Sequence, residues 1–169
     1  ITTLEDTAYT FTAADFGFTD PIDAANSSGA NALANVKIST LPIAGALTNN
    51  GIALNANDSV TVADINAGKL KFTPVADANK AGYASFTFQV QDNGGVANGG
   101  IDLDPSANTI TIDVTSVNDA PSGADKTITT LEDTAYTFTA ADFGFTDPID
   151  AANSSGANAL ANVKISTLP

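Results

Sequence analysis

The sequence contains no cysteine, no histidine and no arginine. Without cysteine the chain can form no disulfide, no thiolate metal site and no cysteine nucleophile. Without histidine, a general base would have to be an aspartate with a raised pKa, and no pair of carboxylates stands in an apolar context at a readable spacing. Ser27-Ser28 and Ser154-Ser155 lie in polar segments with no base nearby in the sequence. These residues predict that the protein is not an enzyme.

Positive charge is scarce. The six lysines stand against 17 aspartates and 2 glutamates, which gives a net charge of −13. Such a surface does not suit nucleic acids or anionic membranes, which bind Lys and Arg, and no apolar run approaches the roughly 18–20 residues of a membrane span. Because Asp favours turns over helices and strands and is a compact oxygen ligand, most carboxylates are expected in loops. We expect divalent cations as partners, and no nucleic acid, membrane insertion or small-molecule substrate.

An internal repeat organises the chain. Residues 128–169 repeat residues 1–42 letter for letter, at an offset of 127 positions (128 against 1). A period of this length is the size of a self-contained domain and not of a solenoid unit of roughly 20–50 residues. We interpret residues 1–121 as one complete repeat, 122–127 as a linker and 128–169 as the first, incomplete third of the next repeat. The segment 117–121 (VNDAP) marks the joint.

Short stretches of alternating apolar and polar residues recur along the repeat, with turn signals about every ten residues. Asn50-Gly51 predicts a hairpin within 46–54, because this pair supplies the positive φ that tight hairpins need. Short helical turns are expected at 13–18, which places Phe16 and Phe18 in the core, and at 63–68. Long loops are expected at 19–34 and 92–107, and strands at 2–4, 8–12, 36–41, 60–62, 69–73, 84–91 and 108–115. Phe11, Phe72, Phe86 and Phe88 are expected in the core.

About seven short strands at this spacing predict an all-β fold, an immunoglobulin-like antiparallel β-sandwich. Another Greek-key sandwich with a different strand order stays open as the alternative.

Oxygen ligands gather in the predicted loops, and calcium takes about six to eight oxygens in irregular geometry. No loop matches a known calcium motif in full: Asp77-x-Asn79-x-x-Gly82 begins like an EF-hand, but Phe88 stands at the twelfth position. Each of the candidate ligands is also typical of a solvated turn or of a stiff linker that binds no ion. The candidates are Glu5, Asp6, Asp20, Asp23, Asp77, Asp92, Asp102, Asp104, Asn118 and Asp119.

Four segments follow one another in a recognisable order: LEDT at 4–7, TDPID at 19–23 before GAN at 29–31, FQVQDNGG at 88–95, and VNDAP at 117–121. In this order they resemble cadherin-like repeats. They are most similar to the tandem extender repeats of large RTX-type bacterial surface adhesins exported by type I secretion. The resemblance covers the whole repeat, and it implies a cadherin-like sandwich in tandem, with calcium bound where domains join.

The resemblance also implies a ligand set. Glu5 would approach the joint from the first domain, Asn118 and Asp119 from the linker, and Asp147 and Asp150 from the second domain; Asp20, Asp23 and Asp92 would serve the joint with a preceding repeat. The linker at 116–120 reads SVNDA, where animal cadherins usually have Asp-x-Asn-Asp-Asn. The Asp-Arg-Glu segment of cadherins has no clear match, with Asp77 as the nearest residue. Fewer or weaker calcium ions per joint are therefore expected.

These features lead to the hypothesis of an extender module in an extracellular stalk on the bacterial cell surface, supporting cell adhesion or biofilm formation. Its partners would be adjacent repeats of the same polypeptide, with calcium stiffening each joint. Identity of 1–42 and 128–169, loops included, favours a spacer over a recognition domain. Two alternatives stay open: a carbohydrate- or protein-binding domain whose site is formed by the loops 19–34 and 92–107, and a calcium-free sandwich appended to a secreted hydrolase.

The incomplete copy at 128–169 carries a further expectation. It would hold only the first strands of a domain, leaving sheet edges and the rings of Phe138, Phe143 and Phe145 without partners. Because it equals residues 1–42, it is expected to be able to replace that segment in a strand-swapped neighbour.

Overall fold

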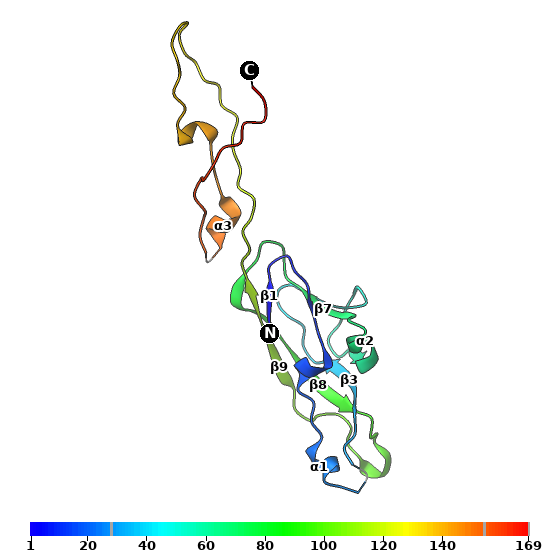
Figure 1. Cartoon of the computed structure of the whole chain (residues 1–169). Helices are drawn as coiled ribbons and strands as arrows, with labels where there is room; N and C mark the ends of the chain where they lie inside the picture. Colours follow the sequence, from blue (N-terminus) through cyan, green and yellow to red (C-terminus); the bar gives the residue numbers. More distant parts are fainter. Residues whose placement is uncertain (28, 154, 169) are drawn as a thin grey trace. The chain divides into compact units, whose positions relative to one another are not determined.

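The computed structural model describes residues 1–27, 29–153 and 155–168. The chain divides into two compact units, residues 1–115 and residues 116–169 (Figure 1). Of the serine pairs considered above, Ser28 and Ser154 lie outside the described residues. Among the residues that are described, no helix has the length and hydrophobicity needed to span a membrane.

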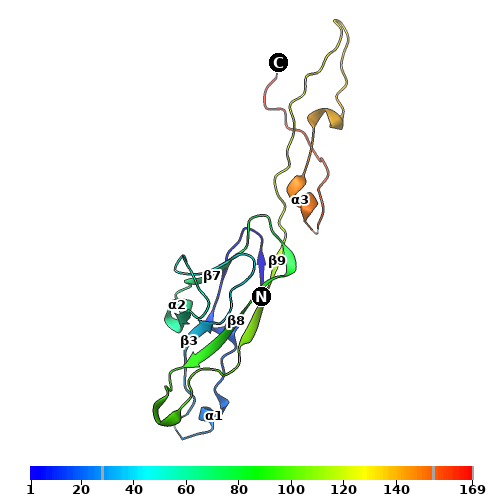
Figure 2. The ribbon, with the colours of Figure 1, turned by 180° about the vertical axis from the view of Figure 1, so that it is seen from behind.

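The first unit consists of two β-sheets packed as a sandwich, which confirms the mostly-β, two-sheet prediction (Figures 1 and 2). The five-stranded sheet has the order β1-β9-β8-β3-β6 and the four-stranded sheet the order β2-β7-β4-β5. The unit therefore has nine strands where about seven were expected. The strands are β1 (Thr2–Leu4), β2 (Tyr9–Thr10), β3 (Leu33–Ile38), β4 (Ala46–Asn49), β5 (Ile52–Ala53), β6 (Ser59–Thr61), β7 (Leu70–Thr73), β8 (Lys80–Asp92) and β9 (Asn108–Thr115).

The beginning of the chain contributes to both sheets. β1 pairs in parallel with β9, with Leu4 opposite Thr115, whereas β2 pairs antiparallel with β7 in the other sheet. The chain crosses between the sheets through a turn in which Asp6 has a φ of 58° and the backbone N–H of Thr7 donates to the carbonyl of Leu4 at 3.3 Å. This crossing places Glu5 and Asp6 at the end of the sandwich where β9 ends.

Alternation along the strands directs a set of rings between the two sheets, as the sequence predicts. Phe11 and Phe72 are fully buried, and the ring of Phe86 lies edge-on to that of Phe11 with centroids 5.7 Å apart. Phe88 and Phe16 are also core residues, but Phe18 is only half-buried and so does not belong to the core as expected. Phe18 follows Gly17, whose left-handed backbone ends the 3-10 helix η1 (Ala13–Phe16).

Turns and short helices follow the local signals with two exceptions, of which one is the 3-10 helix η2 (Ala97–Gly99) inside the expected loop 92–107. The Asn50-Gly51 hairpin forms between β4 and β5 with φ values of 52° and 78°, and α2 (Val62–Asn66) forms where a helical turn was expected. The segment 19–34, expected to be a loop throughout, contains α1 (Pro21–Ala24), which begins with proline at a position that suits its fixed φ. α1 lies at one end of the sandwich (Figure 1).

The second unit reproduces the turns of residues 1–42 but not their strands. It contains η3 (Ala140–Phe143) and α3 (Pro148–Ala152), and its described residues hold an isolated bridge between Ser122 and Thr146 but no β-strand. The expectation of first strands in 128–169 is therefore wrong for the described part of the segment. The reason is that β1, β2 and β3 each pair with a strand formed by residues after 42, namely β9, β7, β6 or β8, and a strand without a partner has no ladder.

Candidate metal-binding sites

The first acidic cluster lies in the first unit, at the end of the sandwich where β9 ends. Glu5 is 1% exposed; its backbone N–H donates to the carbonyl of Thr115 at 2.9 Å, and its Oε2 accepts from the side-chain amide of Asn79 at 2.8 Å. The backbone of the crossing segment and the Asn79 amide, from the β7–β8 loop, thus hold the Glu5 carboxylate in a buried position. The side-chain amide of Asn79 was not predicted to matter, although Asn79 stands in the Asp77-x-Asn79 pattern.

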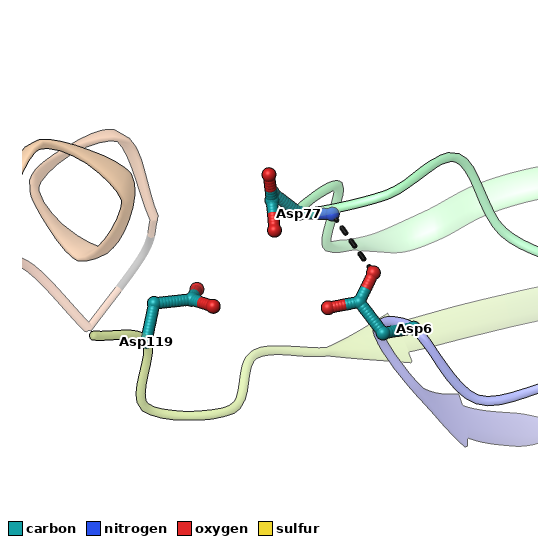
Figure 3. Close-up of side chains that lie close together, drawn as sticks. All are labelled: Asp6, Asp77 and Asp119. Atoms are coloured by element: carbon teal, nitrogen blue, oxygen red, sulfur yellow. Dashed lines mark hydrogen bonds between the residues drawn. The ribbon is translucent and has the colours of Figure 1, made fainter.

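Asp6 and Asp77 form the exposed part of this cluster. The backbone N–H of Asp77 donates to Oδ1 of Asp6 at 3.1 Å (Figure 3), and carboxylate oxygens of the two residues lie within 4.8 Å of each other. Both residues have left-handed backbones, with φ of 58° and 57°, which aspartate tolerates in tight turns. Two carboxylates held this close repel each other unless a cation lies between them. Asp119, drawn in the same figure, belongs to the second unit.

The second acidic cluster lies within the second unit and contains four of the predicted ligands: Asn118, Asp119, Asp147 and Asp150. The backbone N–H of Asp119 donates to Oδ2 of Asp150 at 3.2 Å. Asn158 connects the rest: its side-chain amide donates to Oδ1 of Asn118 at 2.8 Å and to Oδ2 of Asp150 at 2.9 Å, and its backbone N–H donates to Oδ2 of Asp147 at 2.7 Å. The linker and the α3 loop thus meet side by side.

Two of these carboxylates are removed from water. Asp147 is 6% exposed and Asp150 is 1% exposed, although each carries polar oxygens that water would otherwise solvate. Within the described residues, Oδ1 of Asp147 is buried and accepts no hydrogen bond. Asn118, Asp119, Asp147 and Asn158 also line a cavity of about 360 Å³. A buried carboxylate oxygen beside a cavity is costly unless a donor or a cation meets it.

Residues 20–31 of the first unit repeat the loop 147–158, but no linker lies beside them. Two of the loop's hydrogen bonds are the same: the backbone N–H of Asn31 donates to Oδ2 of Asp20 and its side-chain amide to Oδ2 of Asp23, both at 2.7 Å. Asp20 and Asp23 nevertheless stay half-exposed, and Ile22 is 80% exposed whereas its counterpart Ile149 is half-buried. The loop therefore forms its local structure by itself. Its two aspartates are buried only in the copy that has the linker beside it.

Asp92 lies near this loop in the first unit. A Cβ added to Gly94 would stand 2.7 Å from the side-chain amide nitrogen of Asn31 and 3.0 Å from Oδ1 of Asp92, so both side chains approach the same point. Oδ1 of Asp92 also accepts from the backbone N–H of Gly94 at 2.6 Å, the contact of an ordinary turn. The predicted group Asp20, Asp23 and Asp92 thus shares one end of the sandwich, and Asn31 links the first two through its hydrogen bonds.

Asn31 and its copy Asn158 are the residues that sequence reasoning did not assign to the site. Each lies eleven positions after the first aspartate of the TDPID segment, and in each copy its backbone and side chain serve both aspartates. The signal was present, because the GAN segment was part of the resemblance. Asp102 and Asp104 have structural partners: Asp102 accepts from Gln91 at 3.2 Å, and Asp104 accepts from Ser106 at 2.9 Å.

An ion pair in the second unit gives a test of its local fold. The Lys126 ammonium, 2.5 Å from Oδ1 of Asp142, holds the pKa of that carboxyl below its ordinary value, with help from the backbone N–H and hydroxyl of Thr139. A lowered carboxyl pKa stabilises the η3 turn above the ordinary pKa of about 3.9, and this contribution is lost as the pH falls through the folded value.

We expect Lys126→Gln to raise the pKa of Asp142 toward about 3.9, as measured by carboxyl-carbon NMR during an acid titration. Lys164→Gln, at an exposed position in the same unit, is the control and should leave the pKa of Asp142 unchanged. An unaltered Asp142 pKa in Lys126→Gln would contradict the ion pair.

The first unit also has a hollow whose lining mixes apolar residues with five aspartates. A cavity of about 730 Å³ is lined by residues of the segments 15–22 and 101–105, among them Phe18, Ile22 and Ile101. Ile22 and Ile101 are 80% and 79% exposed. This hollow adjoins the loops that the sequence offered as a recognition site.

Comparisons with family models, with curated proteins and with solved structures find no match to this chain.

Proposed function

We propose that this chain is a spacer from a tandem array, a cadherin-like extender repeat of an extracellular bacterial surface adhesin, whose joints bind calcium and become stiff. One observation carries the proposal: two copies of the same loop differ in burial, and the buried copy is the one that meets the linker. In that copy Asp147 and Asp150 are 6% and 1% exposed. Burying two carboxylates beside a third from the linker is favourable when a cation shares them.

The short linker between the two units supports a set of calcium ligands drawn from both of them. Asp119 follows the end of β9 by four residues, so its Cα lies within about 14 Å of Thr115 in any conformation of the linker. Glu5 is hydrogen-bonded to Thr115, and Asp6 and Asp77 lie at the same end of the first unit. We propose that Glu5, Asp6 and Asp77 from the first unit act together with the linker and with Asp147 and Asp150.

The chemistry of the donors selects the ion. All the candidate ligands are carboxylate or amide oxygens, and the sequence has no cysteine or histidine to favour a softer metal. Calcium accepts about six to eight such oxygens in irregular geometry, whereas magnesium demands a near-octahedral site and keeps several waters. An ion shared by both units would tie them together, and its loss would leave converging negative charges that repel. The proposed role is structural, with no reaction catalysed.

The test measures binding and stiffness on the whole chain. Because the sequence lacks cysteine, Ala56→Cys and Ala135→Cys, both exposed and in different units, give two unique positions for spin labels. We expect calorimetry to detect calcium binding, and we expect the distance distribution between the labels to narrow in calcium but not in magnesium or EDTA. Binding without narrowing would refute the stiffening, and no calcium binding would refute the joint site itself.

The hollow of the first unit supports a second candidate function, a recognition domain that binds a sugar or a peptide between 15–22 and 101–105. Its exposed Ile22 and Ile101 favour it. The half-buried state of Ile149 in the other copy favours the spacer instead, because the same isoleucine is partly covered where a linker is present. A glycan array probed with the whole chain distinguishes the two: binding that Ile101→Asp abolishes would support recognition.

A further inference from the structure

The two copies of the TDPID loop present one aspartate with different hydrogen-bond donors. In the first unit the carboxylate of Asp23 accepts from the side-chain amide of Asn26 on Oδ1, at 3.1 Å, and from that of Asn31 on Oδ2, at 2.7 Å. In the second unit Oδ2 of Asp150 accepts from the amide of Asn158, the copy of Asn31, at 2.9 Å. The amide donor on Oδ2 is therefore common to both copies.

The asparagine that follows the short helix has lost its bond to the aspartate in the second unit. The side-chain amide nitrogen of Asn153, the copy of Asn26, is buried and donates no hydrogen bond to any described residue. Asn26 itself is exposed, whereas Asn153 is half-buried. A second donor still reaches the aspartate, because the backbone N–H of Asp119, in the linker, donates to Oδ2 of Asp150 at 3.2 Å. The bond from the linker and the loss of the amide bond thus occur together.

The backbone of the loop does not explain this difference. The first aspartate of the loop has φ −132° and ψ 71° in the first unit, and φ −136° and ψ 70° in the second. The backbone N–H of Asn26 donates to the carbonyl of Asp23 at 2.9 Å. In the other copy the backbone N–H of Asn153 donates to the carbonyl of Asp150 in the same way, at 3.0 Å. The two copies are therefore folded alike up to the asparagine, and what changes is the partner of its side-chain amide.

The amide of Asn153 makes the arrangement with the docked linker costly. A buried donor without an acceptor costs about as much free energy as a lost hydrogen bond, whereas the amide of Asn26 keeps its acceptor. Oδ1 of Asp147, in the same loop, is also buried without a hydrogen bond from the described residues. The docked arrangement is therefore stable only where other interactions, such as those of a shared cation, offset this cost.

We propose that this asparagine regulates the joint, because its amide competes with the linker and with calcium for the aspartate carboxylate. In an array every such loop has a linker beside it, and the first copy shows the hydrogen bonds of the loop while the linker is undocked. The amide then occupies Oδ1 of the aspartate, as Asn26 does on Asp23. When the linker docks, the amide leaves that oxygen, which becomes available to a cation. This inference rests on the proposed joint, and it assigns to Asn153 a role that opposes binding.

Competition of this kind makes binding of the ion conditional on docking of the linker. An amide N–H on a carboxylate oxygen occupies a lone pair that a cation would use, so calcium alone meets an aspartate whose oxygens already have donors. The apparent affinity of a ligand falls by the fraction of the protein that is in the binding-competent state. Each joint is therefore expected to take up its ion and its linker together, and to change from flexible to stiff in one step.

Asn153→Ala in the whole chain tests this competition. Because the variant removes the competing amide, we expect calorimetry to show calcium binding about fivefold more tightly, which is what one hydrogen bond of ordinary strength contributes. Asn26→Ala is the matched control: it makes the same change in the same local sequence, where no linker lies beside the loop, and should leave the calcium affinity unchanged. Removal of a ligand or of a brace of the loop would weaken calcium binding instead. The sign of the effect therefore separates the two roles.

Hydrogen exchange of the Asp119 N–H, followed by NMR in EDTA, supplies a measurement that needs no calcium. This N–H donates to Asp150 when the linker is docked, so its protection reports the docked fraction. In Asn153→Ala we expect the protection to rise about fivefold, because docking no longer displaces an amide. Protection that stays the same or falls overturns the proposal, as does a calcium affinity that does not increase in a chain that binds the ion. If the unaltered chain binds no calcium but the protection rises in the variant, the proposed joint fails and the competition stands, so the two failures are distinguishable.

Discussion

Phe72→Ala is expected to lower the free energy of unfolding of the first unit by about 3–5 kcal/mol, the usual cost of removing a buried phenylalanine ring. Phe72 is fully buried on β7, the strand that pairs with both β2 and β4. Gly45 packs directly against the ring, since a Cβ there would lie 2.5 Å from Cζ of Phe72, and glycine has no side chain that could fill the vacancy. Urea unfolding followed by circular dichroism measures the loss.

An exposed phenylalanine of the second unit provides the control for this prediction. Phe138→Ala makes the same substitution at a position that is 60% exposed, and a change at such a site is expected to stay within about 0.5 kcal/mol. A loss below about 1 kcal/mol in Phe72→Ala would mean that the two sheets do not pack through this ring.

Local signals in the sequence were sufficient for most of the first unit. Alternation placed the strands, and β9 runs from Asn108 to Thr115 as predicted. The Asn50-Gly51 pair fixed its hairpin because the required backbone angles belong to those two residues. Phe18 was misplaced because periodicity shows that a ring needs burial but not which of two nearby rings, Phe16 or Phe18, reaches the core.

The second unit shows the limit of the same reasoning. Its 42 repeated residues carry the strand signals of residues 1–42, and its described part forms the turns without forming a strand. Turns such as those at Thr139 and Asp147 depend on neighbours in sequence, whereas a strand depends on a partner that can be a hundred residues away, as Thr2 depends on Asp113. Identical sequence therefore gives identical local structure and a different sheet.

The candidate site, too, could be predicted from the sequence only in part. The short motifs were enough to single out Asp147, Asp150 and the linker pair, which the second unit places side by side. The residue that joins them, Asn158, was not assigned, because its role arises from the loop closing on itself. Burial could not be read from sequence at all, since Asp23 and Asp150 have the same neighbours in sequence and differ in exposure.

That pair of aspartates gives the most discriminating test of the proposed joint. We expect Asp150→Asn to weaken calcium binding at least about tenfold, or about 1.4 kcal/mol, because it removes a charged ligand from a nearly inaccessible position. Asp23→Asn makes the same change in the same local sequence, where no linker lies beside the loop, and calcium affinity should be unchanged. Calorimetry on the whole chain compares the two variants directly.

The Asp150→Asn substitution should affect the stability of the folded chain differently in calcium and in EDTA. At a calcium concentration a hundredfold above Kd, binding adds roughly 2.7 kcal/mol to the folded state, and Asp150→Asn loses most of that gain. In EDTA the same variant removes one negative charge from a group in which Asp119, Asp147 and Asp150 converge, so the cluster should be at least as stable as before. The amide that replaces the Asp150 carboxylate still has an oxygen that can accept from Asn158, so the loop keeps its hydrogen bond. Such a reversal of sign belongs to a site built to hold a cation, because a purely structural hydrogen-bond network would be weakened under both conditions.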